Sequence, residues 1–477
     1  MTAHEGKVPF KRKLAYASPA FALAIVGIPV YVYIPKFYTD TVGIDIAYLG
    51  LILFSVRIFD AVTDPLFGRW SDLTRTRFGR RRPYIAAGSI FVAVFMFMLF
   101  NPPRGGAALS AVWFGVGIYA LFLFWTAVTV PYESLGPEIT FDYNERTSLF
   151  AIRDGALIAG TLAAAASPAL VRWIFSIPQD PVGERTVYFW ISVIYAPMVI
   201  GTCAWCAYAV REMPSVSHPT VKTSLWRDLR KTTQNRPFMI LLAAYTISAI
   251  GNNLPATLIL YYVEYVLLSS YAEVFLILYF VTGILFLPGW IRISRRVGKK
   301  NAWLASMAIN TGAFVGVFFI GPGDAWIYGA LVCLSGVGFG ATLALPSSIQ
   351  ADVIDYDELL TCQRREGQYV GLWNISKKLA AAVGVGTGLA VLGWVGYQPN
   401  IEQSPRVVFT LQVLYAGVPS VFNLIAFFIA LAYPIDGHIH GKIREAVASR
   451  KSGVSARDPL RPERLLNGRV CEQEATT

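Results

Sequence analysis

The sequence has few charged residues for its length. Only 15% of its 477 residues are Asp, Glu, Lys or Arg, against roughly 25% in an average soluble protein. Apolar residues make up 55%, aromatic residues make up 14%, and the mean hydropathy is +0.49. So few charged side chains cannot cover the surfaces of water-soluble domains of this total length. The composition therefore excludes a soluble protein and predicts an integral membrane protein.

Cysteine and histidine are also scarce. The five cysteines form no disulfide framework, and Cys203 and Cys206, in the sequence CAWC, lie inside an apolar run that favours a packing role over a metal or redox role. All four histidines lie outside the apolar segments (His4, His218, His438, His440). Any proton carrier inside the membrane must therefore be a carboxylate.

Several catalytic motifs are missing. The sequence contains no Walker pattern ending in Gly-Lys-Ser/Thr, so it predicts no P-loop ATPase site. It also contains no HExxH and no GxSxG, so it predicts neither a metalloprotease nor a nucleophile-elbow hydrolase. Two glycine runs, GVGFG (336–340) and GVGTG (384–388), lie within apolar segments and are typical of close helix packing. We expect a protein that is not an enzyme and has no cofactor.

Twelve apolar segments are long enough to cross a bilayer, since a spanning helix needs about 20 residues. They lie near 14–38, 45–67, 84–102, 108–131, 147–174, 186–210, 237–263, 271–291, 301–320, 326–350, 367–396 and 407–433. This pattern predicts an all-α membrane protein with an N-terminal six-helix half (14–210) and a C-terminal six-helix half (237–434). A polar N-terminus (1–13), a linker (211–236) and a disordered tail (435–477) complete the predicted chain.

The net charge of +11 comes from short basic clusters between the apolar segments. The clusters at 11–13, 75–82, 222–231 and 295–300 all lie on one side, and the loops on the other side have few basic residues. The positive-inside rule then places both termini in the cytoplasm. The expected partners are the lipid bilayer of the plasma (inner) membrane and a small-molecule substrate, not nucleic acid, and no feature indicates an oligomeric state.

Two landmarks recur at nearly the same interval. Gly79 and Gly298 each lie in a basic loop, about 219 positions apart, and Pro131 and Pro346 each open an acidic stretch, about 215 positions apart. The repetition indicates two six-helix pseudo-repeats. Parallel repeats of this kind are typical of secondary transporters with a midplane substrate site.

The second apolar segment contains ionisable residues in the sequence RIFDAVTDP. Arg57, Asp60 and Asp64 are spaced i, i+3, i+7, so they share one helical face, with Thr63 beside them. Two ionised carboxylates one turn apart would repel each other, and a bound monovalent cation or a shared proton removes that penalty. The pattern predicts a cation-coupling site, with Asp60 and Asp64 as metal ligands if the ion is sodium. The alternative is structural pairing with Arg57 or Arg153.

Other polar residues could line a central cavity. Arg153 opens the fifth apolar segment, and the eleventh contains Asn374, Lys377 and Lys378. The two lysines point about 100° apart, so only one can face the cavity squarely. A cavity Arg and Lys suit a ligand rich in hydroxyl groups or carrying an anionic group. The alternative is pairing between helices.

The loops between the apolar segments could also control conformation. Asp72 lies among arginines that include Arg75 and Arg80, and Glu133 and Glu138 follow the fourth segment. Ion pairs among them could latch one conformation of an alternating-access carrier. The positive-inside rule for cytoplasmic loops also explains these arginines without any role in gating.

These motifs resemble a known family. The stretches RIFDAVTDPLFGRWSDLTRTRFGRRRP, PYESLGPEIT, DVIDYDE, RREGQ and NISKK are similar to those of the glycoside–pentoside–hexuronide:cation symporters, the melibiose-permease-like branch of the major facilitator superfamily. The likeness extends over the first eleven segments. It implies the major facilitator fold, alternating access, and substrate moving together with sodium, lithium or a proton.

The resemblance assigns roles to particular residues. The family's cation carboxylates fall on Asp60 and Asp64, and the polar residue between them is Thr63. Its sugar-contacting arginine falls on Arg153, its lysine on Lys378, and a cavity threonine on Thr126. The family's acidic sugar ligands are missing, because Ala24 and Thr129 stand in their places, and Glu133 replaces a tryptophan. The cation site is kept, and the sugar site differs.

Three functions are compatible with this pattern. The first is Na+- or H+-coupled transport of a sugar, glycoside or uronide, with Asn374 and the aromatic residues Tyr31, Trp125 and Trp373 adding contacts. The second is transport of a lysolipid or other amphiphile, whose acyl chain would lie along the apolar first segment. The third is a membrane sensor or scaffold that transports nothing.

Overall fold

The computed structural model describes residues 8–140, 143–210, 212, 232–233, 235–362 and 365–467. Most of the predicted linker, the first seven residues and the last ten lie outside these ranges. The helices are α1 (Phe10–Ile28), α2 (Ile34–Lys36), α3 (Ile46–Leu73), α4 (Arg82–Phe100), α5 (Ala107–Ile139), α6 (Tyr143–Ile174), α7 (Pro181–Ala209), α9 (Arg236–Tyr265), α10 (Ala272–Val297), α11 (Lys299–Phe318), α12 (Ala325–Thr361), α13 (Glu366–Val395), α14 (Pro405–Gln412), α15 (Val418–Leu431) and α16 (Gly437–Lys451). Three π-helical segments, η1 (Pro29–Tyr33), η2 (Phe37–Val42) and η3 (Val413–Gly417), interrupt the first and last long helices.

Each predicted apolar segment coincides with a helix or a continuous helical run. Within the described ranges, eleven of these are long and apolar enough to cross a membrane. The twelfth, α11, covers the expected segment 301–320 but carries Asn301, Asn310 and Thr311. These polar residues lower its mean hydropathy.

The first spanning run is irregular. Its α-helical hydrogen bonding changes to the π pattern at Pro29 and again at Phe37, and Gly43 ends the run at φ 88°. Because proline has no N–H to donate, Pro29 and Pro35 loosen the helix at this point. A π segment turns the following side chains around the helix axis and is frequent at functional sites. Tyr31, Lys36 and Asp40 all lie in this stretch.

The chain divides into two compact units that do not coincide with the two predicted six-helix halves. Unit 1 comprises Met1–His218, Ala256–Phe280 and Ala382–Gln412, and unit 2 comprises Pro219–Pro255, Val281–Ala381 and Val413–Thr477. Thus α9, α10 and α13 each have one end in unit 1, where it packs with the N-terminal helices. The boundary within α9 falls at Pro255, a natural weak point in helix hydrogen bonding.

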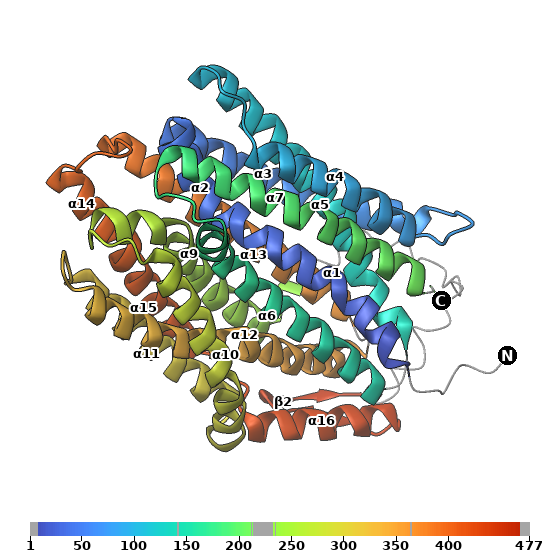
Figure 1. The fold of residues 1–477 in the computed structure, drawn as a ribbon. Coiled ribbons are helices and arrows are strands. Elements are labelled where there is room, and N and C mark those ends of the chain that lie inside the picture. The colour runs from blue at the N-terminus through green and yellow to red at the C-terminus, as the bar shows by residue number, and fades with distance from the viewer. Residues whose placement is uncertain are drawn as a thin grey trace. The chain divides into compact units, whose positions relative to one another are not determined.

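Buried tyrosines brace unit 1. The hydroxyl of Tyr33 donates to the carbonyl of Ala165 at 2.8 Å, and that of Tyr38 donates to the carbonyl of Leu99 at 2.7 Å. α1 packs closely along α6, and the two helices lie side by side in Figure 1. Since a tyrosine hydroxyl buried without a partner is costly, these bonds fix the depth at which the helices meet.

A buried network of asparagine and serine side chains holds unit 2 together. Asn252 on α9 accepts from Asn423 on α15 at 3.0 Å and from Asn310 on α11 at 3.3 Å. Ser335 on α12 donates to Asn310 at 2.7 Å, and Ser248 donates to Asn423 at 2.7 Å. Hydrogen bonds between helices are effective in an apolar environment. Asn310, one of the residues that make α11 less hydrophobic, therefore connects it to α9 and α12.

The segment expected to be a disordered tail is partly ordered. α16 and an antiparallel hairpin of β1 (Ala456–Asp458) and β2 (Arg461–Leu466) lie together in Figure 1. Ile443 and Leu466 are buried in the apolar core of unit 2, and Asp458 accepts a hydrogen bond from Tyr356 at 3.1 Å. A polar composition suggests disorder, but a few buried apolar side chains and one buried hydrogen bond order the segment when a folded surface is available.

Candidate functional site

The two acids of the second spanning helix lie together beside a threonine. Asp60 is buried, with 3% of its surface exposed, and Asp64 is half-buried one turn further along α3. The hydroxyl oxygen of Thr126, on α5, lies 2.8 Å from Oδ1 of Asp60 and 3.3 Å from Oδ1 of Asp64. Two carboxylates and a hydroxyl therefore converge on one point. Thr126, expected among the substrate ligands, lies with the acids instead.

Two other polar groups of α3 lie beside the two acids in the sequence, the Thr63 hydroxyl and the main-chain carbonyl of Ala61. The hydroxyl of Thr63 donates to the main-chain carbonyl of Asp60 at 3.1 Å, within the same helix. Pro65 follows Asp64 and cannot donate to the carbonyl of Ala61, which leaves that oxygen without its usual helical partner. The cluster thus has carboxylate and hydroxyl oxygens, the ligand type that hard cations prefer. Across the described residues, no three His, Cys, Asp or Glu side chains form a metal-binding group.

The arginines that could have neutralised the acids are engaged by other groups. Arg57 is buried, donates to the Tyr31 hydroxyl at 2.7 Å and stacks on the ring of Tyr31, with the guanidinium carbon 3.9 Å from the ring centroid. Arg153 donates to Asp154 at 2.7 and 2.9 Å and lies over the ring of Phe150.

Two of the predicted aromatic residues meet near the acids. Tyr31, Phe122 and Trp125 line a narrow recess together with Gly27, Val30 and Leu121. Trp125 precedes Thr126 in α5, and Tyr31 binds Arg57, one turn from Asp60. An aromatic surface and a cationic donor therefore lie next to the two acids, within unit 1.

The remaining substrate candidates lie in unit 2. Trp373 stacks on Tyr245 with ring centroids 4.0 Å apart, so one face of its indole is covered. Asn374 and Lys378 lie one turn apart on α13; Asn374 is exposed and Lys378 is half-buried, whereas Lys377 is exposed. The helix therefore presents an amide and an ammonium group on one face.

The predicted latch residues form ion pairs within the N-terminal segment. Arg81 binds Asp72 at 2.8 Å and Glu138 at 2.7 Å, and Arg80 also binds Glu138. Arg75 and Glu133 are exposed. A residue that the sequence analysis missed, Glu212, accepts three main-chain hydrogen bonds, of 2.8 to 2.9 Å, from the loop between α3 and α4.

Unit 2 has ion pairs between the end of α12 and the helices α11 and α16. Lys299 binds Asp352 at 2.6 Å, and His440 of α16 lies 3.0 Å from Asp355. Lys451 binds Glu358 at 2.6 Å. The DVIDYDE motif is therefore an anchor for the C-terminal helix, a role that its sequence does not reveal.

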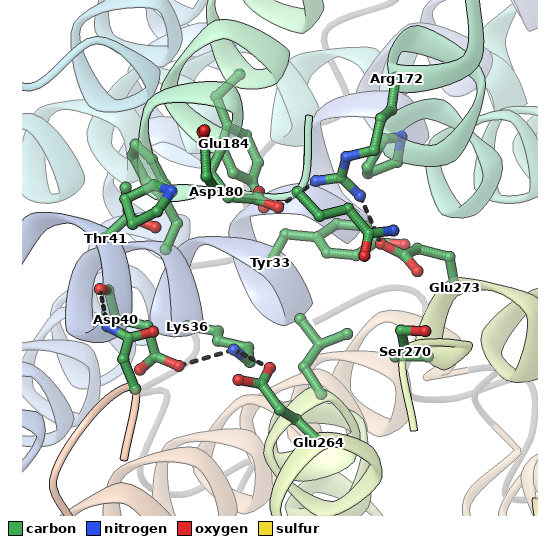
Figure 2. Close-up of a pocket in the computed structure, with 18 of the residues that line it drawn as sticks. Tyr33, Lys36, Asp40, Thr41, Arg172, Asp180, Glu184, Glu264, Ser270 and Glu273 are labelled. Atoms are coloured by element: carbon green, nitrogen blue, oxygen red, sulfur yellow. Dashed lines mark hydrogen bonds and ion pairs between the residues drawn. The ribbon is translucent and has the colours of Figure 1, made fainter. Parts of the chain in front are cut away.

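A further polar cluster, absent from the sequence expectations, surrounds a cavity of about 550 Å³ in unit 1. Figure 2 shows its acidic side chains around two cations: Lys36 lies between Asp40 and Glu264, and Arg172 lies between Glu184 and Glu273. The only sequence signal was the presence of charged residues near the ends of apolar segments, which is common at membrane interfaces.

Comparison with known proteins identifies the family. The family model described as MFS/sugar transport protein matches residues 15–437. The chain belongs to this family. It is a multi-pass membrane transporter, not an enzyme, and the resemblance inferred from its motifs is confirmed.

Individual relatives agree over nearly the whole chain. The glucuronide carrier protein homolog of Escherichia coli K12 is 28% identical and covers 87% of this chain and 90% of its own length. The putative glycoside/cation symporter YagG of the same organism is 26% identical, with coverage of 93% and 96%. The crystal structure of the nucleoside transporter NupG matches with a TM-score of 0.65 at 12% identity, over 88% of this chain and 99% of that one. This last likeness shows the major facilitator fold.

Proposed function

We propose that this transporter couples uptake of a sugar glycoside or uronide to a cation bound by Asp60, Asp64 and Thr126. The observation that carries the proposal is the convergence of two carboxylates and one hydroxyl in the membrane-spanning part of unit 1. Burying two negative charges so close together is costly unless a cation or proton neutralises them. The names of the relatives, a glycoside/cation symporter among them, support the same coupling.

The substrate class follows from the groups beside the cation site. Tyr31 and Trp125 offer aromatic faces, and Arg57 offers a cation that donates to the Tyr31 hydroxyl and stacks on its ring. Asn374 and Lys378 on α13 remain proposed substrate ligands on the basis of the family resemblance. Cationic donors suit a carboxylate-bearing sugar, and the relative named a glucuronide carrier supports this choice. Arg153, bound to Asp154, would have to exchange partners to reach a substrate.

Of the three functions left open by the sequence, the family supports the first. The described relatives are named carriers or symporters of sugar derivatives, which disfavours a sensor or scaffold and gives no support to a lysolipid substrate. Basic loops on one side of the chain support insertion into the inner membrane with both termini in the cytoplasm.

The proposal can be tested by thermal unfolding of the purified protein with methyl glucuronide, methyl galactoside or lysophosphatidylcholine, each with and without Na+ and at several pH values. A true ligand raises the apparent Tm according to its concentration relative to its Kd. Stabilisation by methyl glucuronide that increases with Na+ or with falling pH is expected. Stabilisation by lysophosphatidylcholine alone would overturn the sugar proposal.

A pair of adjacent lysines provides a matched test of the substrate site. Lys378→Ala should weaken methyl glucuronide binding by about tenfold or more, because a charge-assisted hydrogen bond is lost. Lys377→Ala, which removes the same charge from the exposed neighbouring position, should leave binding unchanged. Equal effects of the two substitutions would remove Lys378 from the proposed site.

A further inference from the structure

Asp40 is the centre of a hydrogen-bond cluster in unit 1. Its carboxylate accepts hydrogen bonds from Lys36 (2.7 Å), Tyr265 (3.0 Å) and Tyr397 (2.7 Å), and from Thr39 at 2.7 Å. The carboxylate is nearly fully buried, with 6% of the side chain exposed. Asp40 is not part of the proposed cation site. So many hydrogen-bond donors rarely converge on one carboxylate without a structural or functional reason, so the cluster needs its own explanation.

The donors come from distant parts of the chain. Lys36 and Asp40 belong to the first spanning run, Tyr265 ends α9, and Tyr397 follows α13. The side-chain amide of Asn400 also donates to the main-chain carbonyl of Asp40 at 2.6 Å. The cluster therefore connects the predicted N-terminal half with two helix ends of the predicted C-terminal half, at the end of the first run remote from the N-terminus.

Two ion pairs join the same parts of the chain. Lys36 binds Glu264 on α9 at 2.5 Å, and Arg172 on α6 lies 3.8 Å from Glu273 on α10. Figure 2 shows both cations between acids that come from different helices. Lys36 is mostly buried, so its pairs are poorly screened by solvent.

Below this cluster, α3 and α13 approach closely through small residues. A Cβ atom on Gly386 would lie 2.5 Å from Cβ of Phe54, and one on Gly393 would lie 2.6 Å from Cβ of Ala47. A Cβ on Gly50 would lie 3.0 Å from Cβ of Leu389. No side chain larger than hydrogen fits at these positions without movement, so the contact requires glycine.

We propose that the Asp40 cluster and the glycine contact between α3 and α13 form a gate that is closed in this structure, on the side of the membrane opposite the N-terminus. The proposal rests on the transport function and adds the device that seals one side of the pathway. Hydrogen bonds and ion pairs of moderate strength can break and re-form in each cycle, whereas a large apolar interface would resist opening.

The test uses a reporter cysteine placed beneath the gate. Thr257 lies one turn before Tyr261 on α9, and both are buried. In a background without native cysteines, Thr257→Cys should react slowly with a membrane-impermeant maleimide added from the side opposite the N-terminus. Adding Asp40→Asn should increase the labelling rate about tenfold, as expected when hydrogen bonds to a charged group are weakened.

Asp45→Asn is the matched control. Asp45 lies five residues after Asp40, at the start of α3, and its side chain caps this helix by accepting from the N–H groups of Ala47 and Tyr48. Asparagine caps a helix as well as aspartate does, so labelling of the reporter should stay at the parent rate. Equal labelling of the Asp40→Asn, Asp45→Asn and parent proteins would overturn the proposal.

A crosslink keeps the test decisive if Asp40→Asn folds poorly. Lys36→Cys with Glu264→Cys removes the ion pairs of Lys36 with Asp40 and with Glu264, so it should raise labelling of the reporter. Joining the two cysteines with a short bis-thiosulfonate reagent should lower the labelling again. Both changes are measured by mass spectrometry of the reporter peptide. Labelling that ignores the crosslink would contradict the gate. Neither labelling experiment requires a sugar or a coupling ion. A negative result would therefore contradict the gate and would leave the proposed substrate and cation sites unaffected.

The glycine contact has its own test. Gly386→Leu should also increase labelling of the reporter, because the side chain must displace Phe54. Gly371→Leu, on the same helix, is the control, since a Cβ there meets no atom within 4 Å. If both substitutions leave labelling at the parent rate, the close approach of α3 and α13 does not contribute to closure.

Discussion

Replacement of Thr126 by valine tests whether the coupling cation binds where the structure brings Asp60 and Asp64 together. Valine keeps the shape of the side chain and removes only its hydroxyl, whose oxygen lies 2.8 and 3.3 Å from the two carboxylates. The matched control is Thr129→Val, on the same helix, because the Thr129 hydroxyl donates to the main-chain carbonyl of Trp125 at 3.0 Å and not to an acid.

The size of the effect follows from the contact that is lost. A hydrogen bond to a charged group contributes about 1.5–3 kcal/mol, and 1.4 kcal/mol corresponds to about a tenfold change in an equilibrium constant. If sodium is the coupling ion, Thr126→Val also removes one oxygen ligand, and the Na+ concentration for half-maximal uptake should rise about tenfold to a hundredfold. If the ion is a proton, loss of a donor to the ionised carboxylate favours the protonated acid, so uptake should persist to higher pH.

The assay is uptake of radiolabelled methyl glucuronide into proteoliposomes, measured across a range of Na+ concentrations and external pH values. The direction of the change then identifies the ion, since the two ions predict opposite effects on cation affinity. The reasoning would be refuted if Thr126→Val and Thr129→Val showed the same Na+ dependence and the same pH dependence as the parent protein.

Three further predictions concern the acids, the loop ion pairs and the C-terminal segment. Asp60→Asn should abolish accumulation driven by a cation gradient, because an amide neither balances the cation nor carries the proton; gradient-driven accumulation at the parent level would exclude Asp60 from coupling. Glu138→Gln should lower the Tm by about 2–4 °C, the effect of roughly 1 kcal/mol, because Arg80 and Arg81 lose a shared partner, and an unchanged Tm would contradict this. Truncation before residue 437 should lower the Tm by more than Glu138→Gln does, because it uncovers part of the unit 2 core, and an unchanged unfolding curve would contradict this.

Much of this protein could be predicted from local sequence. Runs of about 20 apolar residues identify spanning helices because the bilayer leaves the backbone no other way to satisfy its hydrogen bonds. Helical periodicity placed Asp60 and Asp64 on one face of α3, and the structure confirms that they share one hydroxyl neighbour. Motifs such as RIFDAVTDP indicated the family, which the family model confirms over residues 15–437.

Some expectations failed because composition does not report on long-range packing. The tail looked disordered by its polarity, but Ile443 and Leu466 find an apolar surface that no local pattern reveals. The hydrogen bond that Asn310 of α11 donates to Asn252 could not be foreseen from the residues around it. In each case the partner lies far away in the sequence.

The sequence by itself determined the helices, the acids that share a face, and the family, because each depends on spacing within one segment. Only the tertiary structure decided that Thr126 belongs to the acids and that Asp40 binds tyrosines from α9 and from beyond α13. Both depend on which helices become neighbours and at what depth. Many weak packing contacts, such as those of Gly386 with Phe54, set which helices are neighbours and at what depth they meet. These contacts join distant segments, so no single segment encodes them.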